Sequence, residues 1–98
     1  MSCKLTTRYT KPNNVRWFGE TNQPTLARIV KNTNEFAGVK SLVYGKVAHG
    51  ATESVIVFED RAACDAFLAA MEENADWQTR KTYNADNGIT AEQTITDL

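Results

Sequence analysis

The segment Val39–Glu59, VKSLVYGKVAHGATESVIVFE, decides the fold, because it contains two strand-like runs separated by a short turn. Both runs are rich in Val, Ile, Tyr and Phe, which suit a pleated and partly buried surface. His49 and Gly50 occupy the turn, and glycine readily supplies the positive φ that a tight hairpin requires. The segment therefore predicts a β-hairpin.

The register of this hairpin determines which side chains share a face of the sheet. A turn at 49–50 places Lys46 opposite Glu53 and Lys40 opposite Glu59, and a slip by one residue would turn every side chain to the other face. In the expected register, one face carries Val39, Ser41, Val43, Val47, Ser54, Ile56 and Phe58. The other face carries Leu42, Tyr44, Val55 and Val57, with the four charges at its rim. Both faces therefore have an apolar centre.

Length and charge set the class of protein. A chain of 98 residues suits one domain spanning residues 1–98, and its 42% apolar content is enough to bury a core. The net charge of −1 gives no electrostatic footprint for nucleic acid or for an anionic membrane. The start of the chain has no apolar run typical of a signal peptide. Two cysteines that form no framework indicate a reduced, cytoplasmic protein.

The remaining elements follow from the apolar spacing along the chain. Residues 4–10 alternate as a first strand, and residues 89–98 alternate as a last one. A helix is expected from Pro24 to Gly38, and a second helix follows Asp60, which is a good N-cap. Residues 74–87 are expected to add a helical turn or two, in which Asp76 and Arg80 have the spacing of an ion pair.

The order β-α-β-β-α-β predicts an α+β, ferredoxin-like domain. Right-handed crossovers then give a four-stranded antiparallel sheet of order 4-1-3-2, with both helices on one face. The uncovered face would be more apolar than solvent exposure requires. It could be tolerated, it could stack a ligand or RNA, or it could pack on a second copy of the chain. We favour a sheet-to-sheet homodimer whose interface consists of Arg8, Leu42, Tyr44, Val55, Val57 and Glu92.

In element order, length and semi-apolar open face, the whole chain resembles the dimeric α+β barrel superfamily, of which the antibiotic-biosynthesis-monooxygenase-like domains are familiar members. The resemblance implies a homodimer with a pocket between helices and sheet in each subunit. Some members of this superfamily oxidise bound aromatic substrates or haem without a further cofactor, and others have no known activity. The resemblance therefore implies either a cofactor-independent enzyme or a module that self-associates or senses a ligand. A structural component of a larger assembly is a third reading.

The expected topology brings the 11–23 loop, the 48–52 turn and residues 74–88 to one end of the sheet. Aromatic walls with a few polar groups are what a small-molecule site needs. The candidate ligand-binding residues are Trp17, Phe18, His49, Trp77, Arg80 and Tyr83. The alternative is that these aromatic residues plug the end of a small core. The sequence assigns no catalytic residue.

Other chemistries lack the residues they need. A single histidine without a cysteine or carboxylate cluster predicts no metal site, and the sequence carries no motif for another cofactor. Cys64 lies on the inner face of a predicted helix, where a thiol is a poor nucleophile. RNA-recognition modules of this topology stack bases on aromatic residues of the central strands, where this chain has Val55 and Val57. We therefore expect neither a nucleic-acid nor a membrane partner.

Overall fold

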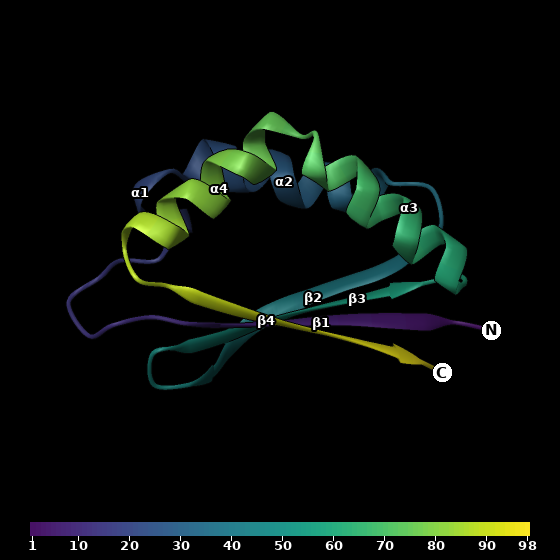
Figure 1. The fold of residues 1–98 in the computed structure, drawn as a ribbon, viewed down its shortest axis with the longest axis horizontal. Coiled ribbons are helices and arrows are strands. Elements are labelled where there is room, and N and C mark those ends of the chain that lie inside the picture. Colours follow the sequence, from purple (N-terminus) through teal and green to yellow (C-terminus); the bar gives the residue numbers. More distant parts are fainter.

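The computed structural model describes all residues from Met1 to Leu98 as a sheet covered on one face by helices (Figure 1). The elements are, in order, β1 (Cys3–Thr10), α1 (Phe18–Thr21), α2 (Gln23–Glu35), β2 (Val39–Ala48), β3 (Ala51–Phe58), α3 (Arg61–Glu72), α4 (Ala75–Asp86) and β4 (Thr90–Asp97). The sheet order is β2-β3-β1-β4 with every pair antiparallel, which confirms the predicted ferredoxin-like sheet.

A polar side chain caps the N-terminus of each of the three long helices, α2, α3 and α4. The side chain of Asp60 accepts a hydrogen bond from the backbone N–H of Ala63 at 2.8 Å and so caps α3. Asn74 caps α4 in the same way, through the N–H of Trp77 at 2.9 Å. With this cap, α4 runs for 12 residues, which is longer than the turn or two expected from its weak apolar period.

The hydrophobic core lies between the sheet and α3. Cys3 and Leu5 from β1 and Ile56 and Phe58 from β3 pack with three side chains of α3, which are Cys64, Phe67 and Met71. Phe67 is the centre of an aromatic cluster, with ring centroids 5.3 Å from Phe36, 5.4 Å from Phe58 and 5.7 Å from Trp77. Both cysteines are free and fully buried.

The register predicted for β2 is wrong, because β2 contains two β-bulges. Ala48 pairs with Ala51 as expected, but the ladder then shifts at Val47, so that Lys46 lies opposite Thr52 and Gly45 opposite Glu53. This shift is the one-residue slip that exchanges the two faces of a strand. A second irregularity at Lys40 turns Val39 back toward the helices, where it packs on the core. Neither predicted lysine–glutamate pair forms across the hairpin.

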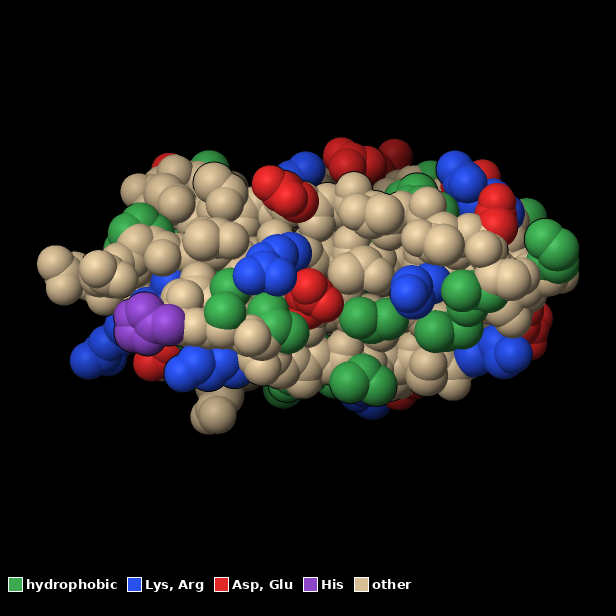
Figure 2. Space-filling model, turned by 90° about the horizontal axis from the view of Figure 1, so that it is seen from below, with side chains coloured by type: hydrophobic (Ala, Val, Ile, Leu, Met, Phe, Trp, Pro, Cys, Tyr) green, Lys and Arg blue, Asp and Glu red, His purple; other side chains and the backbone are tan.

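The shift in register changes which residues lie on the outer face, which is the side of the sheet away from the helices. Leu42 and Tyr44 pair with Ile56 and Ser54 and so face the helices, not the outer face where they were expected. Val43 lies opposite Val55 on the outer face instead, and its side chain is 67% exposed. The outer face thus carries an apolar patch of Val43, Val47, Val55 and Val57. Figure 2 views this side of the molecule, with hydrophobic side chains among charged ones.

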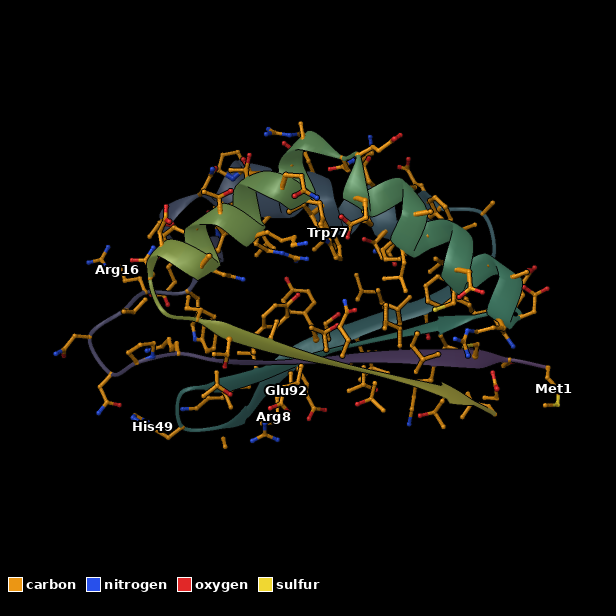
Figure 3. All side chains as sticks on the ribbon, in the orientation of Figure 1. Met1, Arg8, Arg16, His49, Trp77 and Glu92 are labelled. Carbon is orange, nitrogen blue, oxygen red and sulfur yellow. The ribbon has the colours of Figure 1, made fainter.

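Charged residues accompany the outer apolar patch. Arg8 lies opposite Glu92 on β4 and Glu53 on β3, and it forms an ion pair with Glu53 at 3.5 Å. Arg8 and Glu92 project to the same side of the sheet, away from the helices (Figure 3). None of the helices is both long enough and apolar enough to cross a membrane.

Candidate ligand-binding site between the helices and the sheet

A cavity of about 1020 Å³ lies between the helices α1, α2 and α4 and the inner face of the sheet. Ligand sites in proteins are mostly clefts of roughly this size with predominantly apolar walls. The helices and the segment that precedes them contribute Trp17, Phe18, Leu26, Ile29, Val30 and Trp77. The sheet contributes Tyr9, Leu42, Tyr44 and Ile56. Leu42 and Tyr44 thus line the cavity because of the shift in the register of β2.

Trp77 connects the cavity to the core. Its indole meets the ring of Phe67 edge to face, at 5.7 Å and 86°. The cap at Asn74 fixes the first turn of α4, from which Trp77 projects into the space between helices and sheet (Figure 3). The indole is thus held by packing on one side while it lines the cavity on the other.

Arg80, one turn further along α4, lies between the rings of Trp77 and Tyr9. Its guanidinium lies 4.2 Å from the ring centroid of Trp77 and 5.6 Å from that of Tyr9, both within the range of cation–π attraction. The predicted ion pair with Asp76 does not form, because Asp76 binds Arg28 of α2 through two bonds of 2.9 and 3.1 Å. Burial lowers the pKa of Arg80 below its ordinary value, and the nearby Tyr9 opposes that shift.

A smaller compartment of about 400 Å³ lies on the other side of this stack, between α3, α4 and the strands β1 and β4. The two compartments share Thr7, Tyr9, Trp77, Arg80 and Asn84, which we call the junction. The smaller compartment is more polar than the cavity, and Gln93 and the pair Glu72–Lys81 lie among its lining residues. The junction therefore separates the larger, aromatic cavity from a smaller compartment of mixed polar and apolar lining.

The structure brings four of the six predicted ligand-binding residues together. Trp17, Phe18, Trp77 and Arg80 all line the cavity. Tyr83 lies behind this wall: its ring is 5.5 Å from that of Phe18, and its hydroxyl donates to the carbonyl of Arg16 at 2.6 Å. The aromatic residues thus form both an open wall and a packed plug behind it.

The three segments expected at one end of the sheet do meet there. The N–H of Lys11 donates to the carbonyl of Gly50 at 3.0 Å, which joins the 11–17 loop to the hairpin turn, and the bond from Tyr83 to Arg16 joins the same loop to α4. His49 is nevertheless exposed on that turn and does not line either compartment (Figure 3). No group of three His, Cys, Asp or Glu side chains lies close enough together to hold a metal ion.

Sequence reasoning missed several residues of the site. Asn84 was available from spacing, because it follows Arg80 by four and Trp77 by seven residues and so shares their helix face. Tyr9 alternates with Thr7 and Leu5, which places the three on one face of β1. Leu42 and Tyr44 could not be placed, because nothing in the residue types marks the bulge at Val47.

Solved structures of other proteins share this architecture. No protein-family model and no curated protein matches the sequence. Among solved structures, a variant of SnoaB, a cofactor-independent oxygenase from Streptomyces nogalater, superposes with a TM-score of 0.70 at 13% identity, over 99% of this chain and 92% of that one. The chain has the fold of the antibiotic-biosynthesis-monooxygenase-like proteins.

Two further structures support this monooxygenase-like fold. One, described as an antibiotic biosynthesis monooxygenase, has a TM-score of 0.71 at 14% identity and covers 98% of this chain and 97% of its own. The other, a dimeric ferredoxin-like protein from an uncultured marine organism, has a TM-score of 0.69 at 15% identity, with 99% and 96% covered. Identities this low establish a shared fold and transfer no residue roles.

Proposed function

We propose that this protein binds a small planar aromatic molecule in the cavity between its helices and its sheet. The observation that supports this function is the lining: Trp17, Trp77 and Tyr9 offer ring surfaces in a space of about 1020 Å³. Aromatic pairs stabilise a complex by about 0.5–1.5 kcal/mol beyond the area that they bury, so flat ligands gain over saturated ones.

The test is calorimetric titration of the full chain with planar ligands, such as naphthalene and anthracene derivatives, and with their saturated counterparts. We expect saturable binding that favours the planar series. Val30→Trp places a bulky ring in the cavity from α2 and should weaken binding, whereas the same substitution at the outer-face residue Val43 should leave it unchanged. Absence of binding in every series, with the helical circular dichroism intact, would contradict the function.

Oxidation of the bound molecule is the second candidate, and the observation that favours it is the fold shared over nearly the whole chain with the oxygenase SnoaB. In an oxidation without a cofactor, the substrate itself supplies the electrons that reduce O₂. Oxygen uptake that depends on protein and on an electron-rich phenolic substrate would support an enzyme. Ligand binding without oxygen uptake would assign the chain to the class of ligand-sensing or self-associating modules.

A homodimer through the outer face is part of the same proposal. The four valines of the outer apolar patch, with Arg8, Glu53 and Glu92 among them, have the apolar centre and charged surroundings of an interface. One structural neighbour is described as a dimeric ferredoxin-like protein. We also propose a cytoplasmic location, which the two free, fully buried thiols support because thiols persist in a reducing compartment.

A further inference from the structure

Arg80 has aromatic neighbours but no anionic partner in the protein. The guanidinium forms no ion pair, and neither it nor the side chains of Thr7, Tyr9 and Asn84 at the junction takes part in a side-chain hydrogen bond. We propose that the ligand of this cavity is an aromatic acid whose carboxylate binds Arg80 at the junction. This inference rests on the aromatic-binding function proposed above and names the class of its ligand.

Arg80 differs in this respect from the other charged side chains that line the two compartments. Each of those is engaged with a protein group: Glu20 with the N–H of Trp17, Lys31 with Glu35, Glu53 with Arg8, and Glu72 with Lys81. The charge that remains available inside is positive. A ligand that compensates it must therefore carry negative charge.

Arg80 lies where a bound anion would offset the free-energy cost of burying its charge. A charge removed from water costs free energy unless an opposite charge or hydrogen bonds replace the water. The half-buried guanidinium has two aromatic rings beside it, and its carboxylate neighbour on α4, Asp76, is turned away to Arg28. The lowered pKa of Arg80 expresses the same cost of burial. An anion bound here would remove that cost.

The chemistry of the junction favours a carboxylate on an aromatic ring. The planar guanidinium presents parallel N–H donors that match the two oxygens of a carboxylate, and the contacts to Trp77 and Tyr9 do not consume these donors. The carboxamide of Asn84 and the hydroxyls of Thr7 and Tyr9 line both compartments and can supply further donors. The ring would then occupy the aromatic cavity, and the acid group would lie at the junction, facing the smaller compartment.

The test compares matched acids and alcohols on the same ring: benzoic acid with benzyl alcohol, naphthoic acid with naphthylmethanol, and the corresponding anthracene pair. Affinities are measured by calorimetry on the full chain at neutral pH. We expect the best-fitting acid to bind about tenfold more tightly than its alcohol, a difference of about 1.4 kcal/mol. Arg80→Met, which keeps an apolar stem, should remove this preference, so that the acid and its alcohol bind with equal affinity.

The control is Arg16→Met, which removes an exposed arginine that lines neither compartment and should preserve the preference. Equal affinity of acid and alcohol for the wild-type protein would overturn the inference and leave the aromatic-binding function intact. A preference that survives Arg80→Met would also overturn it. Binding of no acid and no alcohol would contradict the aromatic-binding function and this inference together. The wild-type comparison decides the matter even if Arg80→Met fails to fold.

Discussion

At the scale of single residues, the site depends on which partner each polar side chain finds. The position of Trp77 and Arg80 beside the cavity was predictable, because aromatic and basic residues near the end of a sheet are typical of a ligand cavity. The partner of Asp76 was not predictable. A helical spacing of four favours Arg80, but the bond to Arg28 is bidentate and ties α4 to α2. Only the tertiary arrangement decides between the two arginines.

Cys64 gives the fold a dependence on pH. Burial, with a smaller contribution from the neighbouring Cys3, raises the pKa of the Cys64 thiol from its ordinary 9.0 to about 11. The unfolded chain therefore loses this proton at lower pH than the folded one. The contribution of the buried, protonated Cys64 thiol to the stability of the fold is complete below about pH 9 and is lost as the pH rises through about 11.

We accordingly expect the free energy of unfolding to fall between these two pH values, and urea denaturation across this range measures the decrease. Cys64→Ala should lower stability at every pH but give a flatter dependence, because the titrating thiol is gone. Equal slopes for the wild type and the variant would contradict the assignment to Cys64.

At the scale of elements, the helices were easier to predict than the strand pairing. Asp60 and the apolar stripe after it placed α3 correctly, since both signals are local. The faces of β2 depend on one extra residue at Val47, whose effect appears only when the strand is paired. The topology was therefore predictable, but the identity of two cavity walls and of the outer apolar patch was not.

The cap of α4 holds the helix that presents Trp77 and Arg80. Asn74→Ala removes the acceptor for the N–H of Trp77, and we expect the free energy of unfolding to fall by about 1 kcal/mol. Asn74→Asp should retain most of the stability, since Asp caps equally well. Asn34→Ala, at an exposed position of α2 without a side-chain hydrogen bond, is the matched control and should not destabilise the protein. An unchanged urea midpoint for Asn74→Ala would show that the cap is dispensable.

At the scale of the whole molecule, the cavity and the outer apolar patch lie on opposite faces of one sheet. Val43 is 67% exposed in the single chain, so a charge there is compatible with folding but not with an apolar interface. We expect the wild type to have twice the 10.9 kDa mass of one chain by light scattering, and Val43→Glu to have the mass of one chain.

Ala69→Glu introduces the same charge on the exposed face of α3 and should leave the dimer intact. Unchanged circular dichroism would separate loss of association from loss of folding. A wild-type protein with the mass of a single chain at micromolar concentration would refute association through this face.

The bulge at Val47 also bears on how related sequences should be compared. Odd-numbered residues of β2 point to one face of the sheet before the bulge and to the other face after it. In a relative without the extra residue, equivalent side chains would therefore be shifted by one position in the sequence. An alignment that forbids gaps within strands would then match cavity walls to exterior residues. Gaps in this strand therefore have to be permitted, although insertions are ordinarily confined to loops.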